Sequence, residues 1–259
     1  MGIRYAVNEN FFRIWNQDMA YILGFLFADG SMENASYIRG KYVRVSSTDK
    51  DIILKIRDAL NSLHSIVTIA PSQSHRKTRY LLRIGNKKLY DSLVTHGLQP
   101  RKSLTMDFPS VPERYLPDFI RGYFDGDGCA YIETRKNKFS APYYMLKVIF
   151  TSGSRGFLET LAKILHAHCV KHEMPLYSSL RSFQLRYSLC DSIAIFEYLY
   201  CKHKPTMFLE RKLKIFLKYF KLQKGKGPVV KQLTRRSAKP LFTGATPVWA
   251  SRFGRVAER

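Results

Sequence analysis

Apolar residues gather in two segments that read almost alike, Ile22–Gly30 (ILGFLFADG) and Ile120–Gly128 (IRGYFDGDG). Each follows a more polar stretch, is mostly apolar and ends in an aspartate and a glycine. Runs of this kind predict two buried helices. The final residues, Gly30 and Gly128, are expected to take the left-handed conformation that ends a helix.

Small residues recur inside both segments at helical spacing. Gly24 and Ala28, and likewise Gly122 and Gly126, are four residues apart and therefore lie on one face of a helix. Because they carry almost no side chain, two such helices can bring their backbones close together. The pattern predicts a closely packed helix pair.

An aspartate stands before the last glycine of each segment, Asp29 in the first and Asp127 in the second. The end of a helix exposes unpaired carbonyls and the negative pole of its dipole, so a carboxylate there suits a divalent cation. The competing interpretation is a solvated aspartate at the end of an ordinary buried helix, and it is the better one for a single copy. Two copies in register favour a pseudo-symmetric metal site.

The sequence after each segment repeats as well. Val45–Leu54 aligns with Phe150–Glu159 as a strand running into a helix, with N-caps expected at Asp49 and Ser154. Each half then reads as helix, two strands, helix, two strands, helix. The strands are expected in four regions of the chain: 31–47, 66–84, 129–152 and 175–189.

The two segments resemble the motif that gives the LAGLIDADG homing endonucleases their name. The resemblance covers roughly residues 15 to 222, and two copies in one chain are typical of the monomeric, double-motif members. It implies an α+β monomer of two pseudo-symmetric αββαββα subdomains, related by an internal pseudo-twofold axis, whose antiparallel sheets form a DNA-binding saddle. The first copy departs from the motif at Phe27, where the family usually has an aspartate, whereas the second copy keeps Asp125.

The resemblance also implies the active-site residues. Asp29 and Asp127 correspond to the family's metal-binding catalytic acids, and the carbonyls of Ala28 and Gly126 are expected to complete the metal site. The implied cofactor is Mg²⁺, for which Mn²⁺ could substitute.

Further polar residues occupy matching places near the ends of the repeats. Lys102 and Lys212 correspond loosely to family lysines near the scissile phosphates, where a positive charge stabilises developing negative charge. A phosphate-contacting or merely exposed lysine is an equally good interpretation. Ser47 and Ser152 fall where related enzymes carry a polar group near metal-bound water.

The composition indicates a polyanionic partner. The 259 residues hold 43 Lys and Arg against 20 Asp and Glu, a formal charge of +23, which suits double-stranded DNA. A membrane surface is the competing partner, but no long basic amphipathic helix stands out. A purely structural nucleic-acid binder would explain the charge and leave Asp29 and Asp127 unexplained.

Basic and polar residues fall in or beside the predicted strands of both halves. One face of each sheet is expected to enter the major groove, while Val43, Val45, Leu82 and Ile84 face the helices. The alternative is a solvated outer face. The candidate DNA-binding residues are Arg39, Lys41, Arg44, Arg76, Lys77, Arg79, Arg83, Arg135, Lys136, Lys138, Lys147, Arg181, Gln184 and Arg186.

Cysteine usage and hydropathy indicate an intracellular protein. The four cysteines show no paired spacing, which predicts reduced thiols. The longest apolar run is too short to span a bilayer, and no secretory leader opens the chain. His166, His168, Cys169 and His172 have spacing that resembles a zinc site, but without a second half they are better read as exposed helix residues.

Four segments follow from these patterns: an extension over 1–14, subdomains over 15–108 and 109–222, and a basic tail, expected to be flexible, over 223–259. The resemblance implies site-specific double-strand cleavage of DNA with short 3′ overhangs, and two saddles that each cover about one helical turn imply a target of about 20 bp. An intron-encoded enzyme is the favoured origin. The alternatives are an RNA maturase that binds its own intron RNA and a non-cleaving DNA-binding regulator of the same fold.

Overall fold

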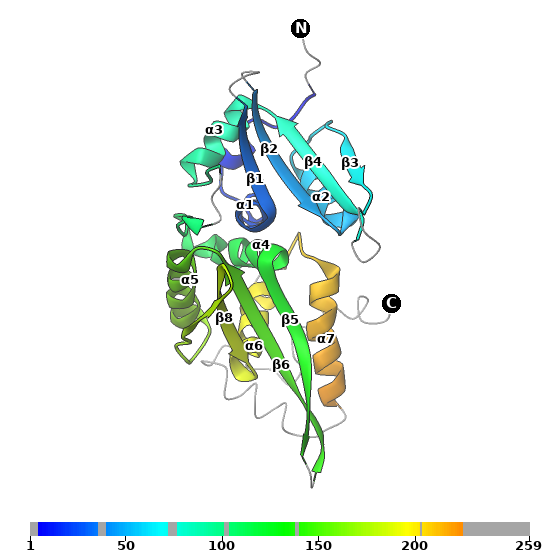
Figure 1. The fold of residues 1–259 in the computed structure, drawn as a ribbon, viewed down its shortest axis with the longest axis vertical. Helices are drawn as coiled ribbons and strands as arrows, with labels where there is room; N and C mark the ends of the chain where they lie inside the picture. Colours follow the sequence, from blue (N-terminus) through cyan, green and yellow to red (C-terminus); the bar gives the residue numbers. More distant parts are fainter. Residues whose placement is uncertain are drawn as a thin grey trace. The chain divides into compact units, whose positions relative to one another are not determined.

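The computed structural model describes residues 5–35, 40–71, 77–100, 104–137, 140–202 and 204–224. The chain divides into two compact units (Figure 1). Unit 1 comprises Met1–Asp127 with Thr206–Leu209, and unit 2 comprises Gly128–Pro205 with Glu210–Arg259. The predicted tail beyond Lys224 lies outside the described residues.

Both motif segments are helices, and both belong to unit 1. They are α1 (Gln17–Asp29) and α4 (Leu116–Asp127). Every residue from Met19 to Phe27 is buried, so α1 is covered on all sides, as its nearly unbroken apolar sequence requires. The Asn16 side chain starts the helix by accepting a hydrogen bond of 2.8 Å from the Met19 N–H.

The predicted close packing of these two helices is confirmed. A Cβ built on Gly24 would lie 2.0 Å from the carbonyl oxygen of Phe119, and one built on Gly126 would lie 2.3 Å from the Cβ of Ala28. Real Cβ atoms do not approach other atoms this closely. The glycines are therefore what allows the two backbones to meet.

The prediction that Gly30 and Gly128 take the left-handed conformation is wrong. Gly30 has φ −83° and ψ 153° and begins strand β1, while Gly128 begins strand β5. Among the described glycines only Gly97 has a positive φ. Gly30 needs its missing side chain for a different reason, because a Cβ there would lie 2.5 Å from the carbonyl oxygen of Leu26.

After its motif helix, each repeat folds into strands and helices in the predicted order. In unit 1 these are β1 (Gly30–Ala35), β2 (Gly40–Ser47), α2 (Lys50–Ala59), β3 (Ile66–Ile69), β4 (Arg79–Gly85) and α3 (Lys87–Thr95). In unit 2 they are β5 (Gly128–Asn137), β6 (Ser140–Ser152), α5 (Arg155–His168), β7 (Leu176–Ser179), β8 (Ser182–Ser188) and α6 (Cys190–Phe196). Unit 2 adds a π-helical turn, η5 (Glu197–Cys201), and a further helix, α7 (Glu210–Lys224).

Each unit contains a four-stranded antiparallel sheet, and the strand orders correspond: β1-β2-β4-β3 and β5-β6-β8-β7. The first strand pairs in the same register in both, Gly30 opposite Val45 and Gly128 opposite Phe150. One face of each sheet is covered by helices of its own unit (Figure 1). Val43, Val45, Leu82 and Ile84 are buried on that inner face, as predicted.

Two further expectations concern the whole chain. None of the four cysteines, all of which lie in the described residues, forms a disulfide, which confirms the prediction of reduced thiols. In the part of the chain that the structure describes, no helix combines the length and apolarity needed to cross a bilayer.

Candidate active site

Asp29 and Asp127 are the last residues of α1 and α4, and both are exposed. The close approach of the helices brings the end of α1 against the last turn of α4. The position where a Cβ on Gly126 would lie is 3.5 Å from an oxygen, Oδ2, of the Asp29 carboxylate. The Cβ of Ala28 takes up the space that a side chain on Gly126 would need, and the Asp29 carboxylate lies in van der Waals distance of that space, one residue before Asp127.

The donor set at these helix ends fits Mg²⁺. Carboxylates and main-chain carbonyls are hard oxygen ligands, and Mg²⁺ in proteins is commonly held by one or two carboxylates together with water and substrate phosphates. A larger side chain at Gly126 would collide with the Cβ of Ala28 and push apart the two helix ends that carry the acids. Among the described residues, no group of three or more His, Cys, Asp or Glu could hold a metal by itself.

The two candidate lysines differ in what the structure shows. Lys102 lies outside the described residues. Lys212, in the first turn of α7, is only 3% exposed, so its interpretation as a merely exposed lysine is wrong. Its Nζ donates a hydrogen bond of 2.7 Å to the carbonyl of Gly128, the residue that follows Asp127 in the chain.

Ser47 and Ser152 are buried at equivalent places, at the ends of β2 and β6. Each hydroxyl accepts a 3.1 Å hydrogen bond from the backbone N–H two residues later, at Asp49 and Ser154. These contacts close the turns that lead into α2 and α5, where Asp49 and Ser154 are the N-caps.

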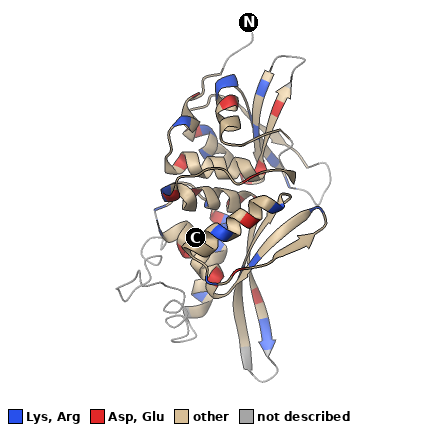
Figure 2. Cartoon of the chain, turned by 90° about the vertical axis from the view of Figure 1, so that its left-hand side faces the viewer, with Lys and Arg blue, Asp and Glu red and all other residues tan. Residues whose placement is uncertain are grey.

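The outer face of the unit 1 sheet, which the helices do not cover, carries a cluster of basic residues around one acid. Glu33 of β1 pairs with Arg44 of β2 and, at 3.1 Å, with Arg83 of β4. Figure 2 shows that Lys and Arg positions and Asp and Glu positions occur together on the strands. The Arg83 guanidinium also lies 3.6 Å from the ring centroid of Tyr42. Arg79 donates a hydrogen bond of 2.7 Å to the Ser46 hydroxyl of β2.

Lys41 does not belong to that outer face. It has the alternation of Val43 and Val45, and its ammonium pairs at 2.6 Å with Asp91 of α3, on the helix side of the sheet. The basic strand residues were expected to line one face, and for Lys41 this is wrong. The alternation of residues along β2 does put Lys41 on the inner face with Val43 and Val45. It was included among the DNA-binding residues because of its positive charge, which Asp91 neutralises.

The outer face of the unit 2 sheet repeats the arrangement. Glu133 of β5 pairs with Arg135 at 3.0 Å and with Lys147 of β6 at 3.6 Å. Arg186 of β8 donates hydrogen bonds to Gln184 and lies 4.8 Å from the ring centroid of Tyr177. Both outer faces therefore combine cations with a carboxylate that holds them.

The remaining candidate DNA-binding residues lie at strand ends or cannot be placed. Lys77 is exposed just before β4, Lys136 is exposed near the end of β5, and Arg181 lies in the turn between β7 and β8. Arg39, Arg76 and Lys138 are outside the described residues.

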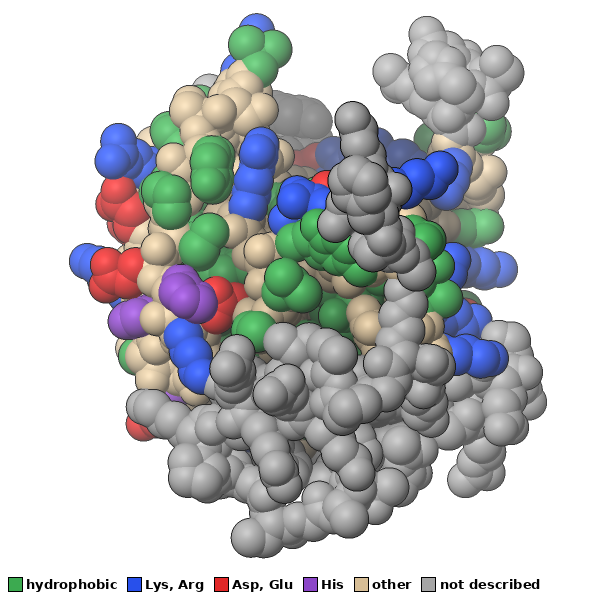
Figure 3. Space-filling model, turned by 90° about the horizontal axis from the view of Figure 1, so that it is seen from below, with side chains coloured by type: hydrophobic (Ala, Val, Ile, Leu, Met, Phe, Trp, Pro, Cys, Tyr) green, Lys and Arg blue, Asp and Glu red, His purple; other side chains and the backbone are tan. Residues whose placement is uncertain are grey.

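The His and Cys residues near the end of α5 do not form a cluster. His172 pairs with Asp191 at 2.8 Å, and the ring of His168 stacks on Tyr198. Burial raises the pKa of Cys169 to about 12. In the space-filling view, His side chains lie beside acidic ones, away from most of the Lys and Arg side chains (Figure 3).

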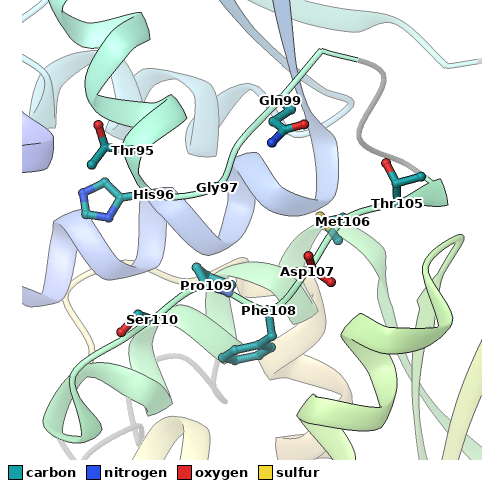
Figure 4. Close-up of a pocket in the computed structure, with 10 residues that line it drawn as sticks. All are labelled: Thr95, His96, Gly97, Gln99, Thr105, Met106, Asp107, Phe108, Pro109 and Ser110. Atoms are coloured by element: carbon teal, nitrogen blue, oxygen red, sulfur yellow. The ribbon is translucent and has the colours of Figure 1, made fainter.

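A separate hollow of about 250 Å³ lies in unit 1 between the end of α3 and the connection to α4 (Figure 4). The His96 ring lies at its edge and is held by a 2.7 Å hydrogen bond to the Phe12 carbonyl. Neither Asp29 nor Asp127 lines the hollow, so it is not part of the metal site.

Sequence reasoning missed a buried polar group in α4. Asp118, Arg121 and Asp125 have at most 1% of their surface exposed. Asp118 and Arg121 form an ion pair of 2.6 Å. Their i,i+3 spacing on a predicted helix was the available signal, together with the retention of Asp125 in the second motif.

Comparison with known proteins gives a family and a fold. The family model for LAGLIDADG-like domains matches residues 16–96 and 116–168. The chain is 27% identical over 156 residues to an uncharacterized protein of Methanocaldococcus jannaschii, covering 60% of this chain and 51% of that protein. It is 28% identical over 153 residues to a probable translation initiation factor IF-2 of the same organism, covering 56% of this chain and 11% of that protein. The chain thus spans about half the length of the first relative and a small part of the second.

The fold is similar to that of two meganucleases of known structure. The LAGLIDADG meganuclease I-AabMI, bound to uncleaved DNA, aligns with a TM-score of 0.56 at 15% identity, over 86% of this chain and 98% of that one. The LAGLIDADG homing endonuclease I-LtrWI, bound to its target DNA, aligns with a TM-score of 0.56 at 11% identity, over 88% of this chain and 96% of that one. The family model covers more than half of the sequence, in two segments with one motif helix each, and the chain therefore belongs to the LAGLIDADG-like domain family.

Proposed function

We propose that this protein is a metal-dependent homing endonuclease that makes a site-specific double-strand break in DNA. The observation that carries the proposal is the pair of exposed aspartates at the ends of two helices packed backbone to backbone. Buried helices of the same fold need no carboxylate at that place. Two acids at matching positions would act at the two scissile phosphates of a duplex, one on each strand.

In this mechanism Asp29 and Asp127, together with the carbonyls of Ala28 and Gly126, would hold Mg²⁺ next to the two scissile phosphates. When bound, the metal supplies an activated water for in-line attack and neutralises charge at the phosphate. Because Gly126 has no side chain, Ala28 packs against it and the Asp29 carboxylate lies close to the other motif helix. The seam between the helices thereby fixes the spacing of the two sites.

The outer faces of the two sheets are the proposed DNA-binding surfaces. Their arginines and lysines would contact phosphates and base edges in the major groove. Two such surfaces, each reading about one turn of the duplex, correspond to a target of about 20 bp. The net charge of +23 favours a polyanionic ligand and a binding constant that falls steeply with salt.

The test is selection of cleaved sites from a randomised or genomic library, followed by cleavage of a plasmid that carries the selected site. Linear plasmid is expected with Mg²⁺ or Mn²⁺, and none with a chelator. Asp29→Asn and Asp127→Asn should each abolish double-strand cutting while DNA binding persists. Nicking of a single strand by either variant would be consistent with the proposal, because the other site is intact. Double-strand cutting by either variant at the wild-type rate would refute the assignment, and DNA or intron RNA binding without any cutting would favour the regulator or the maturase.

A further inference from the structure

The two motif helices differ at three buried positions. In the alignment of the motifs, Asp118, Arg121 and Asp125 of α4 correspond to Ala20, Leu23 and Phe27 of α1. The α4 residues are all ionisable, and the α1 residues are all apolar. Because burying a charge is unfavourable unless it is paired and hydrogen-bonded, the partners of these groups show what they hold in place.

Two of the three bind one short segment, Thr206–Leu209, here called the strap. The Asp125 carboxylate accepts a hydrogen bond of 2.8 Å from the backbone N–H of Leu209. Arg121 donates from Nε to the carbonyl of Met207 at 2.9 Å, while its Nη2 pairs with Asp118. The same Asp125 oxygen accepts a 2.7 Å hydrogen bond from the Tyr21 hydroxyl of α1.

The strap belongs to unit 1 although the chain on both sides of it belongs to unit 2. Two contacts outside α4 reinforce that attachment. The Thr206 hydroxyl donates a hydrogen bond to Asp18 of α1, and Lys55 of α2 lies 5.5 Å from the ring centroid of Phe208. The strap is thus tied to α4 by two buried hydrogen bonds and to α1 by an exposed one.

The strap leads directly into α7, which starts at Glu210 and carries Lys212 in its first turn. Lys212 is the buried lysine whose Nζ reaches the carbonyl of Gly128, next in sequence to Asp127. A change in the strap would move the start of α7, and with it the lysine. In α1 the position that corresponds to Asp125 is occupied by Phe27, whose side chain has no oxygen or nitrogen that could accept a hydrogen bond.

We propose that Asp125, Arg121 and Tyr21 form a clamp that positions the strap, and through it the start of α7, whose Lys212 donates a hydrogen bond to the carbonyl of Gly128. The clamp serves one of the two cleavage sites only, because α1 has no equivalent. Its residues are positioning residues, since they touch the strap and not the substrate. This inference rests on the proposed endonuclease function.

The test uses the double variant Tyr21→Phe/Asp125→Leu in the full-length protein. Replacing both the donor and the acceptor avoids leaving the tyrosine hydroxyl unpaired, so the fold is expected to survive while the Leu209 N–H loses its acceptor. The control is Phe27→Leu, at the position equivalent to Asp125, which alters the contact of α1 with Phe119 and keeps the hydrogen bonds that Asp125 and Arg121 make to the strap.

Two measurements are made on each variant. The first is the rate at which each strand of an end-labelled target duplex is cut, with Lys212→Gln identifying the strand that Lys212 serves. The double variant should slow that strand by about a hundredfold, as a shift of about 1 Å does, while slowing the other strand by much less. The control should change both strands by similar factors.

The second measurement is amide hydrogen exchange, which needs no activity. The Leu209 amide and the first turn of α7 should lose protection in the double variant and keep it in the control. Equal slowing of both strands, or unchanged protection at Leu209, would overturn the clamp. If the wild-type protein cuts no DNA, the endonuclease proposal fails, while the exchange measurement still decides whether the clamp holds the strap.

Discussion

Gly122 of α4 lies directly against the backbone of Tyr21 in α1. A Cβ placed on Gly122 would be 2.0 Å from the Tyr21 carbonyl oxygen and 3.0 Å from the amide nitrogen of Phe25. These are backbone atoms of a fully buried helix, so they cannot move aside as a flexible side chain could. The distance between the two helices, and between the acids at their ends, is therefore set at this residue.

Gly122→Leu is expected to force the helices apart and to reduce cleavage far more than DNA affinity. Overpacking of this kind costs about 1–3 kcal/mol of stability, and catalytic geometry is sensitive to shifts of about 1 Å. Urea denaturation, DNA binding and cleavage rate are measured together. Gly156→Leu, on an exposed part of α5, is the control and should spare activity. Wild-type cleavage by Gly122→Leu would remove the structural basis of the two-acid site.

Glu33→Gln is expected to increase affinity for DNA that lacks the target site. Burial raises the pKa of Glu33, but hydrogen bonds and charges from Arg44 and Arg83 outweigh it and lower the pKa below its usual value, so the carboxylate is ionised at neutral pH. Removal of the Glu33 charge frees both arginines to bind DNA phosphates, and it also removes a negative charge that repels those phosphates. An interaction of about 1 kcal/mol between unit charges near 4 Å corresponds to roughly fivefold in affinity.

Binding of Glu33→Gln to target and to scrambled duplex is measured at several salt concentrations. The gain should be larger for scrambled DNA and should shrink as salt rises. The matched control is Glu159→Gln, which breaks an ion pair of 2.8 Å with Arg155 on the surface of α5. If the two variants bind scrambled DNA equally well, the carboxylate at Glu33 does not restrain the arginines.

Stability is expected to fall as pH rises from about 4.5 to about 7, because of Glu197. Burial raises the pKa of this residue, at the start of η5, to about 7, whereas an unfolded glutamate titrates near 4.3. The folded state therefore holds the proton more tightly than the unfolded state. At low pH Glu197 is neutral in both the folded and the unfolded state, so it does not lower the free energy of unfolding. Above the folded-state pKa its carboxylate is charged and buried, and the full cost in stability is present.

Glu197→Gln should remove this dependence. At pH 8 the variant should be more stable than the wild type by up to about 4 kcal/mol, the linkage value for a shift of this size, and the difference should vanish near pH 4.5. Urea denaturation from pH 4.5 to 8 measures it. Glu173→Gln, at an exposed position, should show a constant difference. A constant difference for Glu197→Gln would contradict the raised pKa.

The thiols of Cys129 and Cys169 should be alkylated at different rates. Because burial raises the pKa of Cys169 to about 12, almost none of it is the reactive thiolate at pH 8, whereas Cys129 is exposed. Iodoacetamide labelling of the folded protein, followed by peptide mass spectrometry, should modify Cys129 much faster. In urea the two rates should converge, and equal rates in the folded protein would show that Cys169 is not protected.

Much of the fold could be predicted because its signals are local. Alternation along β2 and β4 placed Val43, Val45, Leu82 and Ile84 on the inner face, and the repeated register of the first strands followed from the aligned motifs. The glycine conformations could not be predicted in the same way. A glycine that avoids a clash, such as Gly30 beside Leu26, looks the same in sequence as one that takes a positive φ.

The sequence by itself determined the order of the elements, the small-residue seam between the motif helices and the places of Asp29 and Asp127, since each depends on spacing within one helix or strand. The tertiary structure decided which charges meet. Lys41 turns to Asp91 of α3, and Asp125 reaches Leu209 across 84 residues of chain. Such pairings depend on how separate elements pack, and hydrophobic periodicity carries no information about a partner that distant. The strap, the clamp and the buried position of Lys212 are for that reason properties of the fold.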